Sequence, residues 1–169
     1  MTKVVLIGGP SSGKTTLIQM LKKEGYSVIS ETASEIILTY KNRKDIDFSE
    51  LQDKISEEQI IKEQKIYSGQ LTFLDRGIYD GLAYCEKYLN LIPEKTKRII
   101  SEHKGYDRIF LLERLPFVKE SYRLESNDSE AQELHERVIK IYESLGYKLE
   151  RIPILPKEER LNYLLEKVK

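Results

Sequence analysis

The octapeptide Gly8-Gly9-Pro10-Ser11-Ser12-Gly13-Lys14-Thr15 sets the architecture of this 169-residue chain. It satisfies the pattern G-x-x-x-x-G-K-[ST], whose glycines let the backbone wrap closely around phosphate oxygens. Consecutive N–H groups then form a nest for an anion at the start of a helix, where the helix dipole favours negative charge. Lys14 can reach the β and γ phosphates, and the Thr15 hydroxyl can coordinate Mg²⁺. We therefore predict that residues 8–15, together with Thr16, bind a nucleoside triphosphate.

The segments on either side of this phosphate loop support that interpretation. Val4–Ile7 is a continuous apolar run, which is typical of a strand buried on both faces. Lys14–Glu24 carries apolar residues on one side and is followed by Gly25, which favours a helix that ends there. A glycine-rich turn that binds nothing is the alternative, and the order strand, loop, helix argues against it.

Predicted helices and strands alternate along the rest of the chain, which indicates an α/β domain with a mainly parallel sheet. Residues 1–169 are expected to form a single domain. The further strands are predicted at Ser27–Ser30, Leu71–Leu74, Arg108–Leu112 and Tyr147–Ile152. The further helices are predicted at Thr32–Tyr40, Phe48–Tyr67, Asp80–Leu89 and Glu94–Lys104, then from a cap at Asn127 or Asp128 up to Gly146, and finally from Pro156 to Val168.

Composition excludes several classes of protein. Lys and Arg number 28, as do Asp and Glu, so the formal net charge is +0, which argues against a nonspecific nucleic-acid binder. The single cysteine, Cys85, excludes an intrachain disulfide and a cysteine metal cluster, and we expect it to be packed in its helix. The four-residue apolar run near the start is too short for a secretory signal, and no stretch approaches the ~20 apolar residues of a membrane span. A soluble, cytoplasmic protein is the expectation, and no pattern sets an oligomeric state.

Other P-loop classes fit the sequence poorly. A GTPase would carry a guanine-reading N-K-x-D after a late strand, whereas Asn42-Arg43-Lys44-Asp45 has the wrong order and comes too early. The turn Asp75-Arg76-Gly77 does not read D-x-x-G, because Ile78 follows. An AAA machine or a helicase would need a further domain for which 169 residues leave no room.

The length and order of elements resemble those of P-loop nucleoside and nucleotide kinases. More closely, the chain is similar to the AAA-domain family that includes the ribosylnicotinamide kinase module of NadR. That resemblance implies a three-layer α/β/α sandwich with a five-stranded parallel sheet in the order 2-3-1-4-5. It is carried by the phosphate loop, Ser30–Ile37, Phe73–Gly77 with Asp80–Tyr84, Tyr122–Glu125 and the closing segment Leu145–Arg160.

The same resemblance implies the roles of five further residues. Asp75 ends an apolar strand, where a carboxylate can hold Mg²⁺ through water or orient the nucleophile, and Arg76 follows it over the acceptor and phosphates. Glu31 follows the second strand and is the expected base for the acceptor hydroxyl, with Asp75 as the alternative. Arg123 and Arg114 are the expected lid cations, which would stabilise charge on the transferred phosphoryl group.

The sequence thus predicts an ATP- and Mg²⁺-dependent kinase with a small-molecule acceptor, such as a nucleoside or nucleoside-like alcohol. Residues 31–69 would bind the acceptor, and residues 113–126 would form the lid. The alternatives are a nucleotide-binding ATPase or regulatory protein without an acceptor, and a kinase that prefers GTP as donor. Residues 152–156 would contact the donor base or only stop the strand. His103 and His135 lie in polar helices without a catalytic partner and are expected at the surface.

Overall fold

The computed structural model describes residues 2–41, 46–119 and 124–168, and these build a parallel sheet of five strands. The strand order is β2-β3-β1-β4-β5, which confirms the predicted order 2-3-1-4-5. Val5 pairs with Leu74 of β3 on one side and with Ile109 of β4 on the other. The strands are β1 (Thr2–Ile7), β2 (Ser27–Ile29), β3 (Leu71–Asp75), β4 (Arg108–Leu112) and β5 (Leu149–Ile152).

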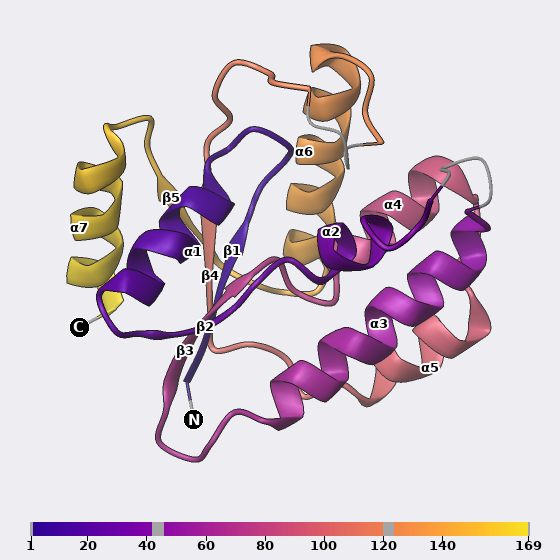
Figure 1. Cartoon of the computed structure of the whole chain (residues 1–169), viewed down its shortest axis with the longest axis horizontal. Helices are drawn as coiled ribbons and strands as arrows, with labels where there is room; N and C mark the ends of the chain where they lie inside the picture. Colours follow the sequence, from indigo (N-terminus) through magenta and orange to yellow (C-terminus); the bar gives the residue numbers. More distant parts are fainter. Residues whose placement is uncertain (1, 42–45, 120–123, 169) are drawn as a thin grey trace.

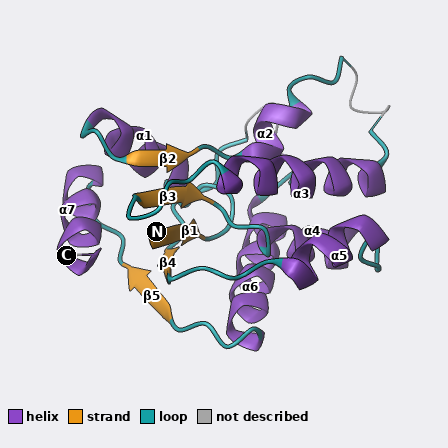
Figure 2. Ribbon diagram, turned by 90° about the horizontal axis from the view of Figure 1, so that it is seen from below, coloured by secondary structure: helices purple, strands orange, loops and turns teal. Residues whose placement is uncertain are grey.

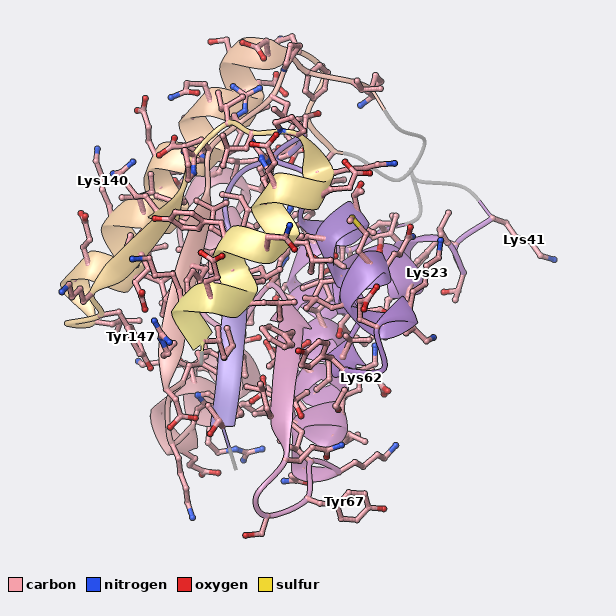
Figure 3. All side chains as sticks on the ribbon, turned by 90° about the vertical axis from the view of Figure 1, so that its left-hand side faces the viewer. Lys23, Lys41, Lys62, Tyr67, Lys140 and Tyr147 are labelled. Atoms are coloured by element: carbon pink, nitrogen blue, oxygen red, sulfur yellow. The ribbon has the colours of Figure 1, made fainter. Side chains whose placement is uncertain are left out.

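Seven helices of the described residues cover the two faces of this sheet (Figure 1). Figure 2 shows α1 and α7 on one face and the other helices, including α3, α4, α5 and α6, across the sheet. In Figure 3 α7 faces the viewer with α1 beside it. The helices are α1 (Lys14–Lys23), α2 (Thr32–Ile37), α3 (Phe48–Gln64), α4 (Asp80–Tyr88), α5 (Glu94–Glu102), α6 (Asp128–Ser144) and α7 (Lys157–Val168).

Alternation along β1 builds both layers of the core, because successive side chains of a strand point to opposite faces. Val4 and Leu6 pack into a cluster with residues of α1 and α7. Val5 and Ile7 pack into a second cluster with residues of α4 and α6. All four side chains are completely buried, as expected for a strand in the centre of a sheet.

Several predicted elements are shorter in the structure. The helix predicted to reach Tyr40 ends at Ile37, since the N–H groups of Thr39 and Tyr40 bond three residues back, as in a turn. The helix predicted to reach Tyr67 ends at Gln64 for the same reason. The last strand begins at Leu149, because the N–H of Tyr147 still bonds to Tyr142 at the end of α6.

The two predicted caps of α6 are resolved in favour of Asn127, whose side chain accepts a hydrogen bond of 3.0 Å from the N–H of Glu130. Cys85 is fully buried in α4, as predicted. None of the described helices combines the length and apolar composition that crossing a membrane requires.

Candidate functional site

The phosphate loop joins β1 to α1 and is held from its outer side. Gly8 and Gly13 have φ angles of 137° and 87°, which a residue with a Cβ rarely adopts. The carbonyls of Gly8 and Gly9 accept hydrogen bonds of 2.9 and 3.0 Å from the Lys14 ammonium. Further donors satisfy the next carbonyls, so the loop has a defined shape while its carbonyls remain partnered. These donors are Arg114 to Pro10, the N–H of Leu115 to Ser11, and Arg160 to Ser12.

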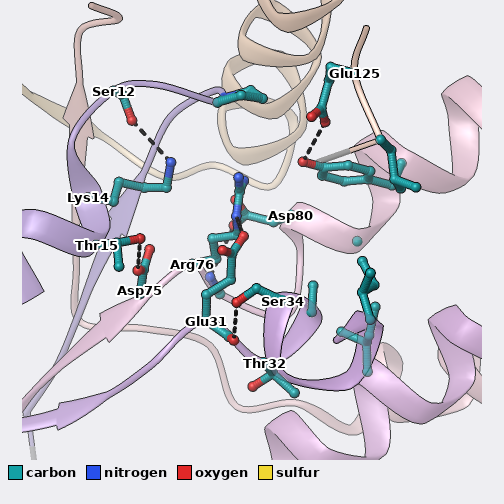
Figure 4. A pocket seen from close by; sticks show the side chains of 18 of the residues that line it. Ser12, Lys14, Thr15, Glu31, Thr32, Ser34, Asp75, Arg76, Asp80 and Glu125 are labelled. Atoms are coloured by element: carbon teal, nitrogen blue, oxygen red, sulfur yellow. Dashed lines mark hydrogen bonds and ion pairs between the residues drawn. The ribbon is translucent and has the colours of Figure 1, made fainter. Parts of the chain in front are cut away.

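Lys14 is buried at the centre of the loop, and its ammonium also donates to the Ser12 hydroxyl at 3.0 Å (Figure 4). Burial and the nearby Arg76 guanidinium lower the pKa of Lys14 to about 8. An ammonium in such a position is stabilised by any anion that enters the loop, because the anion restores the electrostatic partner that water would supply.

Thr15 and Asp75 meet where α1 starts and β3 ends. The Thr15 hydroxyl donates to Oδ2 of Asp75 at 2.7 Å, while Oδ1 of Asp75 is buried without a hydrogen-bond partner among the described residues. Burial and the charge of Glu31 raise the pKa of Asp75 to about 6. A hydroxyl and an orphaned carboxylate oxygen are hard ligands that suit Mg²⁺, which usually keeps several waters and shares phosphate oxygens. The two residues therefore fit a magnesium site.

That site would be completed by the nucleotide rather than by the protein. Within the ranges that the structure describes, no group of three or more His, Cys, Asp or Glu side chains could hold a metal.

Arg76 follows Asp75 and lies between two acids. Its Nε donates to Glu31, and its Nη1 donates to Asp80 at 3.3 Å. Its φ of 72° is uncommon for a residue other than glycine, and the bond from its own N–H to the Leu6 carbonyl (3.1 Å) helps to hold that conformation. Burial opposes ionisation of Glu31, but the charges of Arg76 and Lys14 outweigh it, so the pKa of Glu31 is lowered. Glu31 is therefore an ionised carboxylate beside the phosphate loop.

Asp80 holds this arrangement together, although the sequence analysis gave it no functional role. Its Oδ2 accepts from the N–H of Gly77 at 3.0 Å and from the Tyr142 hydroxyl at 2.8 Å. Its Oδ1 is therefore positioned to pair with Arg76. Asp80 lies in the stretch Asp80–Tyr84 that carried the family resemblance, which was the available signal.

Arg114, one of the two predicted lid cations, is placed differently from the other site residues. Nη2 of Arg114 pairs with Asp128 at 2.5 Å, and Nη1 donates to Gln132 at 3.0 Å. Arg114 thus braces the outer side of the phosphate loop and is not among the residues that line the cavity beside it. Arg123 lies outside the described residues.

A cavity of about 430 Å³ opens beside the phosphate loop. Its walls come from the loop, from α2, α3 and α4, and from described residues around the predicted lid (Figure 4). Tyr84 lines it and donates to the buried carboxylate of Glu125 at 3.2 Å. Gln52 of α3 also lines it, is 3 % exposed, and leaves its amide Oε1 buried without a partner in the described part of the chain. Gln52, Tyr84 and Glu125 were not predicted from the sequence.

The prediction that both histidines lie at the surface is wrong. His135 of α6 is buried, and its Nδ1 accepts a hydrogen bond from the N–H of Gly9 at 2.9 Å. A Cβ on Gly9 would lie 2.7 Å from the Cβ of His135, so glycine permits this close approach. The side chain of His103 is only 4 % exposed and pairs with Glu63 at 2.9 Å. Both histidines are buried because tertiary contacts supply the polar partners that their helices lack.

Several solved structures share this fold at low sequence identity. A deoxyadenosine kinase from M. mycoides, with products dCMP and dCDP, matches 99 % of this chain and 98 % of its own at a TM-score of 0.67 and 16 % identity. A thymidylate kinase from Ehrlichia chaffeensis matches 99 % of this chain and 98 % of its own, with a TM-score of 0.69 and 13 % identity. NadR protein in complex with NAD and AMP-PNP matches with a TM-score of 0.73 and 19 % identity. The match covers 99 % of this chain but only 48 % of the NadR chain.

The fold and the phosphate loop together define a kinase-like P-loop NTPase. The sequence matches the family described as AAA domain over residues 3–160, and the chain belongs to that family. No curated protein matches the sequence significantly.

Proposed function

We propose that this chain is an ATP- and Mg²⁺-dependent kinase that phosphorylates a hydroxyl group of a small molecule, a nucleoside or nucleoside-like alcohol. The observation that carries the proposal is the cavity beside the phosphate loop, with Glu31 and Arg76 between the loop and the acceptor space. A protein that only hydrolyses ATP needs room for a water molecule there, whereas this cavity of about 430 Å³ extends from the phosphate loop to Gln52 of α3. The amide oxygen of Gln52 is buried without a partner among the residues that the structure describes, which favours a polar ligand in that space.

The solved structures of the same fold favour the same substrate class. The deoxyadenosine kinase holds dCMP as a product, and NadR protein has been solved with NR. These are likenesses at 16 % and 17 % identity, so they support the choice of acceptors to test.

The residues divide the work of phosphoryl transfer among them. Lys14 and the loop N–H groups would bind the phosphates, and Thr15 and Asp75 would hold Mg²⁺, which neutralises charge on the phosphate oxygens. Residues 31–69 would bind the acceptor, and residues 113–126, with Arg123, would close over the donor, while Arg114 braces the loop from its outer side.

Glu31 would accept the proton of the acceptor hydroxyl, whose oxygen forms the new bond to phosphorus while the bond from the γ phosphorus to the bridging oxygen breaks. Arg76, held between Glu31 and Asp80, would stabilise the charge on the transferred group. Asp75 remains the alternative base.

The test is acceptor-dependent formation of ADP. Purified protein with ATP and Mg²⁺ is incubated with a panel of nucleosides, and ADP and phosphorylated product are both quantified. At least one nucleoside should raise ADP well above the reaction without acceptor, and the Lys14→Ala variant should abolish that rise. If no acceptor raises ADP above background, the kinase proposal is wrong.

The second candidate is a nucleotide-binding ATPase without an acceptor, since Lys14, Thr15 and Asp75 alone suffice to bind a nucleotide and its metal. It predicts slow hydrolysis that no small molecule changes and a partner captured in only one nucleotide state. Calorimetric comparison of ATP with GTP would decide the donor.

A further inference from the structure

Arg160 of α7 is a buried cation, and no acid among the described residues forms an ion pair with it. The residue is 4 % exposed, and its Nη1 donates to the carbonyl of Ser12 at 2.7 Å. Its Nε and Nη2 are buried without a hydrogen-bond partner in the described ranges. Glu113 is the acid whose charge acts on Arg160, but Glu113 is bound to Arg151 at 2.7 Å. A buried charge without a counterion costs free energy in the ligand-free protein, so its presence calls for an explanation.

The contact to Ser12 connects this charge to the phosphate nest. The carbonyl of Ser12 and the N–H of Gly13 belong to the same peptide unit. A cation on the carbonyl side polarises that unit and makes its N–H a stronger donor, as in any chain of hydrogen bonds. The N–H of Gly13 bonds to no acceptor within the described part of the chain. It is therefore free to donate to an anion.

The other two arginines near the loop differ from Arg160 because each of them is paired with an acid. Arg114 donates to the carbonyl of Pro10 but is paired with Asp128. Arg76 lies between Glu31 and Asp80. Arg160 is the cation in this group that keeps a full positive charge next to the loop, and an oligophosphate in the nest would supply the missing negative charge.

We propose that Arg160 is a positioning residue of the nucleotide site: it holds and polarises the Ser12–Gly13 peptide, and its charge becomes neutralised only when an oligophosphate binds. The inference rests on the proposed function, because it requires that the loop binds a nucleotide. It adds the C-terminal helix α7 to the groups that determine nucleotide affinity.

The experiment measures the affinity of the full chain for ADP with Mg²⁺ by calorimetry, and the melting temperature without ligand. Arg160→Lys keeps a charge, Arg160→Gln keeps a neutral donor, and Arg160→Met keeps only the apolar stem. Charged hydrogen bonds are about twice as strong as neutral ones, so Arg160→Gln and Arg160→Met should bind ADP about tenfold more weakly. Arg160→Lys should remain within about threefold of the wild type.

The ligand-free melting temperature separates this role from a purely structural one. Arg160→Met removes an unneutralised buried charge, so its melting temperature without ADP should not fall. The exposed Arg98 of α5 provides the control, because Arg98→Gln makes the same charge change away from the loop and should leave ADP affinity unchanged.

Three outcomes would overturn the proposal. In the first, Arg160→Gln binds ADP as tightly as the wild type. In the second, Arg160→Lys loses as much affinity for ADP as Arg160→Gln, which would show that the charge is irrelevant. If Arg160→Met does not fold, the ADP affinities of Arg160→Lys and Arg160→Gln still test the proposal. In the third, wild-type protein binds no ADP, and the proposed function fails as well. Tight ADP binding without phosphorylation of any acceptor would sink the kinase proposal alone.

Discussion

The ring Nδ1 of His135 accepts a hydrogen bond of 2.9 Å from the backbone N–H of Gly9, so helix α6 holds the phosphate loop at its second residue. Only a neutral ring can accept this bond, because both nitrogens of a protonated imidazole are donors. Burial lowers the pKa of His135, with the cations Lys14 and Arg114 acting in the same direction against Glu113.

This bond should make folding stability depend on pH. With its folded pKa depressed, His135 binds fewer protons in the folded than in the unfolded state below about pH 6.5. Its contribution is complete above that pH and is lost as pH falls, by up to about 1.4 kcal/mol for each pH unit. In His135→Asn the amide oxygen can still accept from Gly9 but does not titrate. The free energy of unfolding, measured with denaturant, should fall less between pH 7.5 and pH 5.5 for His135→Asn than for the wild type. Equal decreases in the two proteins would contradict this role of His135.

Lys14→Ala should reduce phosphoryl transfer by about 100-fold or more, because it removes the main charge that stabilises the transferring phosphate. The fold should survive, since the buried ammonium is itself incompletely solvated. Steady-state kinetics and a thermal melt check both statements. Lys23→Ala, an exposed lysine at the other end of α1, is the matched control and should behave as wild type. If Lys14→Ala retains full activity, the phosphate loop does not take part in phosphoryl transfer.

Because of Asp75, the Mg²⁺ concentration that gives half-maximal activity should depend on pH. Its pKa is raised to about 6 in the absence of metal, and Mg²⁺ needs the ionised carboxylate. The Mg²⁺ concentration for half-maximal activity should therefore rise as pH falls below about 6 and level off above it. Asp75→Asn keeps the acceptor for Thr15 and should remove most activity at every Mg²⁺ concentration. An Mg²⁺ requirement that is equal at pH 5.5 and 7.5 would argue against Asp75 as a ligand.

Glu31→Gln should lower kcat by about 10²- to 10⁴-fold, as expected for loss of a general base, with little change in nucleotide affinity. The amide still accepts from Arg76, so the geometry of the pair is preserved. Glu35→Gln, in helix α2 that Glu31 precedes, changes an exposed carboxylate bound to Lys62 and is the control. If Glu31→Gln keeps its kcat, Asp75 becomes the base.

Gln52→Leu should raise the KM for the acceptor by about tenfold and leave ATP affinity unchanged, since it removes one hydrogen-bonding group from the cavity. Its melting temperature should not fall, because the amide oxygen of Gln52 has no partner among the described residues. Gln59→Leu is the contrasting variant. Gln59 accepts from Thr32 at 2.7 Å and donates to Glu63 at 3.0 Å, so this substitution should destabilise the fold. An unchanged acceptor KM in Gln52→Leu would place the acceptor elsewhere.

The fold could be predicted because its signals are local. The continuous apolar run at Val4–Ile7 and the phosphate loop define a buried strand followed by a helix. Lys14 and Thr15 belong to a contiguous motif, and Glu31, Asp75 and Arg76 follow strands whose carboxyl ends meet at one edge of a parallel sheet. Residues at the carboxyl ends of parallel strands can therefore be placed together from the sequence even when, like Glu31 and Arg76, they lie far apart in the chain.

His135, Gln52 and Arg160 could not be assigned roles in this way, because their partners lie far away in sequence. His135 and Gly9 are separated by 126 positions, and Arg160 and Ser12 by 148. On a helix of mixed composition, each resembles an ordinary polar residue until the tertiary contacts are known. Glu159-Arg160 formed part of the family resemblance, but that resemblance named no role for the arginine.

The phosphate loop is attached to both helix layers of the sandwich. His135 reaches it from one face of the sheet, and Arg160 reaches it from the other. Any movement of these two helices relative to each other would therefore pull on the loop at Gly9 and at Ser12 and change the spacing of its N–H groups. Nucleotide affinity should therefore depend on how well the helices pack on both faces of the sheet. Substitutions in either hydrophobic core should weaken nucleotide binding before they unfold the protein.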